Sequence, residues 1–198
     1  MFLGARTSRS HGSRFGLDFM TNPFEPTDID LAFREGCRAL GEVVYFFQQL
    51  EDDLGRVVSF LIDPEDSTTA DVVVHEQSFK QLVGLAYSLF DQYVEATVSD
   101  NAKEWRGILS RALAAEGDRN AILHSTFGVS DFQEPTFCRS KITAKFGKGL
   151  KEHAEALDDA TMTAYRQSIS SVANDMIEFM GRVFPRWNTR SWKRDWSE

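Results

Sequence analysis

The chain has 198 residues, of which 42% are hydrophobic and 26% are charged, and its formal net charge is -8 at pH 7. This length suffices for one domain with a sizeable core, and the composition is typical of a soluble globular protein. The negative charge argues against a protein that coats nucleic acid through its overall charge, and no apolar run approaches the ~18–20 residues of a membrane span. Without such a run, we expect no membrane partner. Cys37 and Cys138 stand apart and form no CxxC pair, so we expect free thiols in a reducing cytoplasm.

The chain divides into three predicted regions. Residues 1–27 are rich in Arg, Ser and Gly and lack the apolar core of a secretory signal. We interpret them as a disordered arm, or as an extension ahead of a start at Met20, in preference to a very short transit peptide. A helical domain is expected over residues 28–184. Residues 185–198 form a tail that carries three Trp residues without a periodic pattern.

The first long helix is indicated by apolar residues that recur at steps of three and four between residues 40 and 61. Thr27 or Asp28 is a suitable N-cap, and Asp63, which precedes a Pro, ends the helix. Gly36 and Gly41 weaken the first half, so a bend is expected there.

Three more long helices follow from the same spacing. One covers about residues 77–98, and the next starts near Ala102 and ends either before or beyond Gly117. The last begins near Lys148 and is stopped at Phe184 by the Pro that follows it.

Two connecting segments are less regular. Residues 71–74 are ambiguous between a helical turn and a strand, and their helical neighbours favour the helix. Residues 129–147 have no helical stripe, and a short extended piece is compatible with them. The predicted fold is therefore all-α, an antiparallel bundle of four long helices with short accessory helices.

Common enzyme signatures are absent from the sequence. It contains no GxSxG, P-loop, GxGxxG or HExxH motif. Each of the four His residues lacks a second His or Cys at ligand spacing, so we expect no metal site and no cofactor. Residues 51–53 form an acidic run, which we interpret as a solvated helix face.

One compact polar set remains, in the stretch RNAILHSTFG. If residues 119–124 are helical, Asn120 and His124 share a face, and the long side chain of Arg119 reaches the same side. A histidine suits proton transfer, and an arginine can brace a phosphate with two hydrogen bonds. This set fits metal-independent RNA cleavage, in which one proton is removed and another delivered. One His cannot easily do both, whereas two copies in a symmetric homodimer can.

The alternative is a purely structural role for the same side chains. An Arg and a His near a helix end commonly bind carbonyl groups or pair with nearby carboxylates. Glu116 and Asp118 are available for such pairing.

The hexapeptide Arg119 to His124 resembles the R-x4-6-H motif of the HEPN superfamily, named for higher eukaryote and prokaryote nucleotide-binding domains. The polar Asn120 directly after the Arg matches, as does the order of long helices over about residues 28–183; Gly117, which loosens the helix before the motif, departs from the pattern. The resemblance implies an all-α, usually dimeric domain, often a metal-independent endoribonuclease of toxin–antitoxin, phage-defence or RNA-processing systems. Arg119 and His124 would then be catalytic and Asn120 would assist, with an antitoxin or a nucleotidyltransferase as partner. Other members bind nucleotides or proteins without cleaving RNA, which is the alternative function.

A local basic strip also fits RNA binding. The predicted phosphate-binding residues are Arg139, Lys141, Lys145 and Lys148, with Lys151 beyond them and no acidic residue between. The alternative is a solvated loop and first helical turn. The tail residues Trp187, Trp192 and Trp196 lie among Arg and Lys residues, and they suit either stacking on bases or packing on the bundle.

Overall fold

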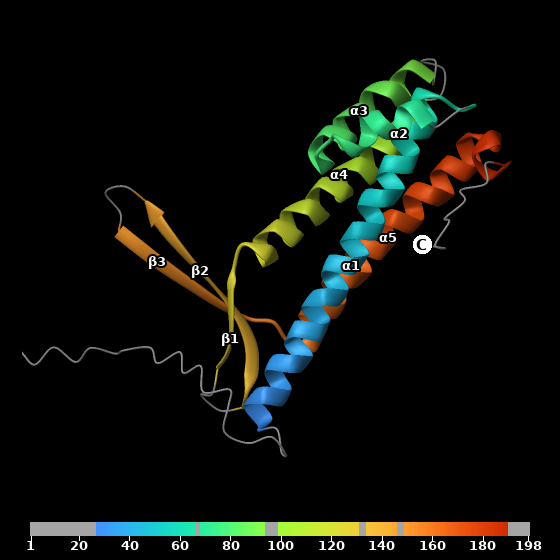
Figure 1. Cartoon of the computed structure of the whole chain (residues 1–198). Helices are drawn as coiled ribbons and strands as arrows, with labels where there is room; N and C mark the ends of the chain where they lie inside the picture. Colours follow the sequence, from blue (N-terminus) through green and yellow to red (C-terminus); the bar gives the residue numbers. More distant parts are fainter. Residues whose placement is uncertain (1–26, 66–67, 94–98, 131–133, 146–148, 190–198) are drawn as a thin grey trace, which may run out of the picture.

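Five α-helices and a small antiparallel sheet make up the part of the chain that the structure describes (Figure 1). The computed structural model describes residues 27–65, 68–93, 99–130, 134–145 and 149–189. Of the arm predicted over residues 1–27, only Thr27 is described. The helices are α1 (Asp28–Ile62), α2 (Thr68–His75), α3 (Phe79–Tyr93), α4 (Ser99–Leu123) and α5 (Asp159–Val183). The strands are β1 (Thr126–Ser130), β2 (Thr136–Lys145) and β3 (Gly149–Ala156), and a 3-10 helix, η1, covers Pro185–Thr189. The chain is mostly helical, as predicted, but the sheet was not expected.

The boundaries predicted for α1 are confirmed. Thr27 and Asp30 form a capping box, in which the Thr27 hydroxyl accepts the Asp30 backbone N–H and the Asp30 carboxylate accepts that of Thr27. Asp63 is the C-cap. The helix passes through Gly36 without interruption, and a Cβ built there would overlap the Phe137 ring of β2. The absence of a side chain at Gly36 therefore allows α1 and the sheet to pack closely.

The middle helices agree with the predicted spacing. Residues 71–74 are helical within α2, as favoured, and α3 ends at Tyr93, before residues 94–98, which are not described. Helix α4 continues through Gly117 to Leu123. Nothing lies within 4 Å of a Cβ built on Gly117, so this glycine is on an open face of the helix.

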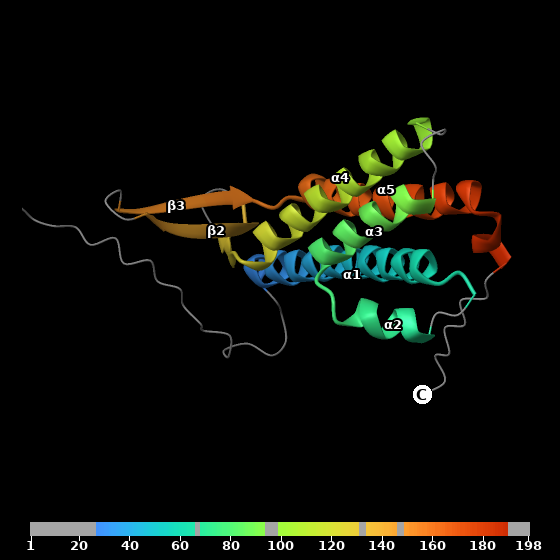
Figure 2. The ribbon, with the colours of Figure 1, turned by 90° about the horizontal axis from the view of Figure 1, so that it is seen from above.

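Helix α1 is central, because it contacts α2, α3, α4 and α5 (Figure 2). Near the start of α4, the core consists mainly of aromatic side chains. Trp105 is 1% exposed, stacks on Phe179 of α5 at 5.2 Å between ring centroids, and lies 5.4 Å from the Phe90 ring of α3. Its indole N–H donates to the Ala86 carbonyl at 3.2 Å. These contacts join α3, α4 and α5 at one point.

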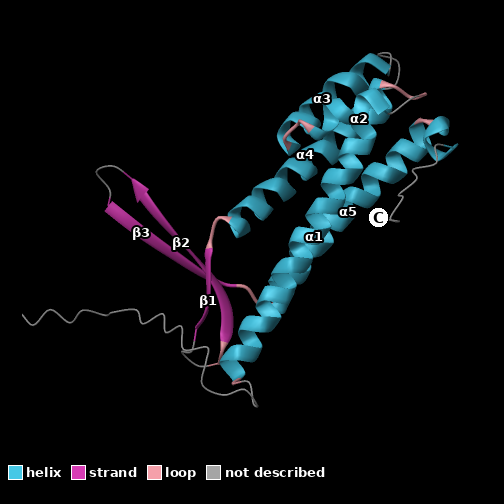
Figure 3. Cartoon of the chain, viewed as in Figure 1, coloured by secondary structure: helices cyan, strands magenta, loops and turns pink. Residues whose placement is uncertain are grey.

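The sheet has the order β1-β2-β3, and both pairs are antiparallel. Its base packs on the first turns of α1 through Phe137, which is 5% exposed and stacks on Phe127 of β1. Beyond this base, the β2–β3 hairpin extends away from the helices (Figure 3). The short connection from α4 into β1 places the end of α4 between the helical core and the sheet.

The predicted start of the last helix near Lys148 is wrong. Residues 149–156 form β3, and α5 begins at Asp159 behind the N-cap Asp158, whose carboxylate accepts the Thr161 backbone N–H. The segment GLKEHAEA contains Lys, Glu and Ala, which favour helices locally. Antiparallel pairing along β2, from Cys138 opposite Ala156 to Lys145 opposite Gly149, overrides this preference.

The C-terminal tail begins packed on the helices. Trp187 in η1 is 5% exposed, and its ring lies 5.4 Å from the Phe60 ring of α1. For Trp187 the structure thus shows packing in place of stacking on bases, while Trp192 and Trp196 lie outside the described residues. In the described part of the chain, no helix is both long and apolar enough to cross a membrane.

Candidate functional site

Arg119 occupies a core-facing position of α4. Buried residues of this helix recur at steps of three and four, and Arg119 lies four residues after Ala115 and three before Ile122 in the same series. Its side chain is half-buried, and the guanidinium carbon lies 4.4 Å from the centroid of the Phe47 ring of α1. A guanidinium over an aromatic face gains a cation–π attraction. Helix packing therefore holds this cation against α1.

Asn120 is joined to Arg119 by a side-chain hydrogen bond. Arg119 Nη1 donates to Asn120 Oδ1 at 2.8 Å, and both side chains are half-buried. The long Arg side chain thus reaches the side of its neighbour, as the sequence predicted.

Glu51 is a member of this site that was not predicted. It lies one helical turn after Phe47 and is half-buried, although the run that contains it was interpreted as solvated. Burial raises the pKa of the Glu51 carboxyl, and the charges of Asp52 and Glu116 raise it further against the attraction of Arg119. The spacing of Glu51 from Leu50, Leu54 and Phe47 is the signal that places it beside the buried stripe.

His124 lies directly after the last residue of α4. Its backbone N–H donates to the Asn120 carbonyl at 3.1 Å, and its side chain is exposed. Within the described residues, no carboxylate or carbonyl binds the imidazole, and neither Glu116 nor Asp118 forms an ion pair with Arg119 or His124. The structure brings Arg119 and Asn120 into contact and leaves His124 one turn away, open to solvent.

The predicted basic strip lies on a β-ribbon and not on a helix start. Arg139 is half-buried, and its Nε and Nη2 donate to Glu155 Oε2 at 3.0 and 2.7 Å, so its charge is already paired. Lys141 is exposed, and the register places it opposite His153. Lys145 ends β2 with its side chain outside the description, and Lys148 lies outside the described residues altogether.

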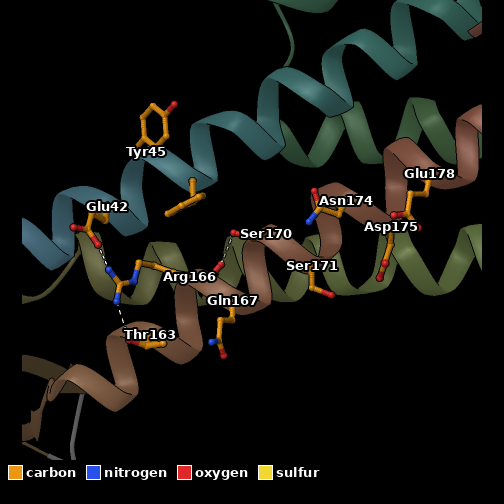
Figure 4. A pocket seen from close by; sticks show the side chains of 11 residues that line it. Glu42, Tyr45, Thr163, Arg166, Gln167, Ser170, Ser171, Asn174, Asp175 and Glu178 are labelled. Carbon is orange, nitrogen blue, oxygen red and sulfur yellow. Dashed lines mark hydrogen bonds and ion pairs between the residues drawn. The ribbon is translucent and has the colours of Figure 1, made fainter. Parts of the chain in front are cut away.

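A separate groove of about 890 Å³ runs between α1 and α5 (Figure 4). Arg166 lies in it and pairs with Glu42, and its Nη2 donates to the Thr163 hydroxyl at 2.8 Å. The remaining α5 lining is mainly hydroxyl and amide groups, contributed by Gln167, Ser170, Ser171 and Asn174. Uncharged polar residues at steps of three and four along α5 are the sequence signal for this groove. Because its one Arg is paired internally, it offers hydrogen bonds and no unpaired cation for an anion.

The end of α4 combines three chemical properties. A guanidinium is held by an aromatic ring and an amide, a carboxyl of raised pKa lies beside it, and an imidazole is accessible one helical turn away. This combination can bind an anionic group and exchange a proton with it. No family model, curated protein or solved structure matches the chain.

Proposed function

We propose that this chain is a metal-independent endoribonuclease with a HEPN-like antiparallel bundle of four long helices. The observation that carries the proposal is the exposed imidazole of His124, one helical turn after the hydrogen-bonded Arg119–Asn120 pair. The accessible His is the acid–base group, Arg119 balances the charge of the phosphate, and Asn120 holds Arg119 in place. Lys141, Lys145 and Lys148 of the hairpin region guide the RNA backbone.

The proposed reaction is attack of a ribose 2′-oxygen on the adjacent phosphorus. His124 of one copy removes the 2′-OH proton as the new O–P bond forms. The bond from phosphorus to the 5′-oxygen breaks, and the protonated imidazole of the second copy delivers a proton to that oxygen. The products are a 2′,3′-cyclic phosphate and a free 5′-OH. Because each chain contributes one His to the site, a homodimer supplies both proton transfers. In a toxin pair, an antitoxin or a nucleotidyltransferase would control the nuclease.

Cleavage of single-stranded RNA and of tRNA in the presence of EDTA tests the proposal. Loss of a general acid–base group costs about 10²–10⁴-fold, so His124→Ala is expected to lower the rate by at least about 100-fold. His75→Ala, which removes an exposed His at the end of α2, is the matched control and should cleave like wild type. Mixing His124→Ala with Arg119→Ala should restore part of the activity if both copies share a site. Wild-type protein that does not cleave RNA, or a His124→Ala variant that cleaves it at the wild-type rate, would contradict the proposal.

A non-catalytic interaction module is the second candidate. The observation that favours it is that the Arg119 guanidinium contacts Phe47 and Asn120, both within the same chain. Arg119 would then mainly stabilise the α1–α4 contact. On this view Arg119→Ala lowers the free energy of unfolding by about 1–2 kcal/mol through lost stem packing and cation–π attraction, and wild-type protein leaves RNA intact.

A further inference from the structure

Helix α2 carries apolar side chains on its outer face as well as on its inner one. Ala70 and Val74 face α1 and are buried, whereas Val72 is 67% exposed and Val73 is 44% exposed. Ile62, 37% exposed, lies at the adjoining end of α1. A hydrogen bond from the Ser59 hydroxyl to the Asp71 carboxylate ties these two places together. The exposed valines of α2 and the isoleucine at the end of α1 indicate a surface that binds another group.

The C-terminal segment leaves the fold beside this surface. Trp187 of η1 packs on Phe60, the residue after Ser59. Arg186 forms an ion pair with Glu65 in the connection between α1 and α2. The described chain ends at Thr189, and seven further residues, which span at most about 25 Å when extended, reach Trp196.

The sequence of residues 190–198, RSWKRDWSE, complements the surface in two ways. Trp192 and Trp196 are four residues apart, a spacing that places both on one face of a helix or of a strand. Arg190, Lys193 and Arg194 outnumber Asp195 and Glu198 in this segment, while residues 62–76 contain five acidic residues and no Lys or Arg. The Arg186–Glu65 pair is the same type of contact, already formed at the start of the segment.

We propose that residues 190–198 dock on the outer face of α2, with the Trp192 and Trp196 rings on Ile62, Val72 and Val73 and the basic side chains against the acidic border. The C-terminal segment is thus an intramolecular cover for α2. The proposal is independent of RNA cleavage, because none of these residues belongs to the Arg119 site.

Limited trypsin digestion of the full chain tests this docking, with cleavage after Arg190, Lys193 and Arg194 followed by mass spectrometry. Val72→Lys removes an apolar contact and repels the basic segment, and Val72 is exposed enough that the helix tolerates the change. Because burial of one valine corresponds to about a tenfold shift in an equilibrium, the variant should be cleaved about tenfold faster than wild type. Val44→Lys, at a 37% exposed position of α1, is the matched control and should be cleaved at the wild-type rate.

Three results would overturn the proposal. Equal cleavage of wild type and Val72→Lys would mean that the segment does not contact α2. If protection of residues 190–198 from trypsin increases with protein concentration, the surface binds a second copy of the chain. Protection that requires added single-stranded RNA, and is unchanged by Val72→Lys, would make the Trp residues an RNA-binding element.

Discussion

Glu51 shows how one half-buried carboxyl links stability to pH at the candidate site. Burial is the largest cause of its raised pKa and outweighs the attraction of Arg119. A raised folded-state pKa means that the ionised form is less favourable in the folded protein than in the unfolded chain. The stabilising contribution of the neutral carboxyl is fully present below the ordinary pKa of 4.5 and is lost as the pH rises through the folded-state value.

The variant Glu51→Gln is therefore expected to be more stable than wild type at neutral pH. The advantage should shrink as the pH falls towards about 4, because the wild-type carboxyl then becomes neutral as well. Thermal unfolding of both proteins across this pH range measures the effect. Glu76→Gln, which removes an exposed carboxyl outside this site, controls for net charge; equal behaviour of the two variants would contradict the burial argument.

At the scale of elements, the contact between α1 and the sheet depends on a missing side chain. The Phe137 ring lies where a Cβ of Gly36 would be, and Phe33 meets the same ring edge-on at 6.0 Å. The sequence suggested a bend at this glycine, but its function is to let a strand approach a helix.

Gly36→Ala is expected to lower the free energy of unfolding by about 1–3 kcal/mol, as for overpacking of a well-packed contact. Gly41→Ala is the control in the same helix, since nothing lies within 4 Å of a Cβ built there. That change should be neutral or stabilise by about 0.5–1 kcal/mol through helix propensity. Urea denaturation measures both, and equal effects would mean that the Phe137 contact does not hold the sheet.

At the scale of the whole molecule, stability concentrates where α3, α4 and α5 meet around Trp105. We expect Trp105→Phe to cost about 2–3 kcal/mol, since it leaves a cavity and deprives the Ala86 carbonyl of a donor. Urea unfolding checks this, with Tyr93→Phe at a 47% exposed position as a control that should stay within about 0.5 kcal/mol. A loss below about 1 kcal/mol would show that the three helices are held together elsewhere.

The apolar spacing by itself located the four long helices, although it placed the start of the last one near Lys148 instead of Asp159, and the capping residues located the start of α1. This works because burial of a helical stripe is a repeating local pattern that neighbouring residues reinforce. The same local reasoning singled out Arg119, Asn120 and His124, because these residues lie close together in the sequence at the end of α4.

Only the tertiary structure decided where strands replace helix and which side chains surround Arg119. The segment GLKEHAEA has helix-forming residues, and only pairing with β2, with partners between 4 and 18 residues apart in the chain, makes it a strand. Likewise, Glu51 and Phe47 lie about seventy residues before Arg119, and only the packing of α1 on α4 places them beside it. Contacts between distant segments leave no local periodicity in a single sequence, so they become visible only when the chain is folded.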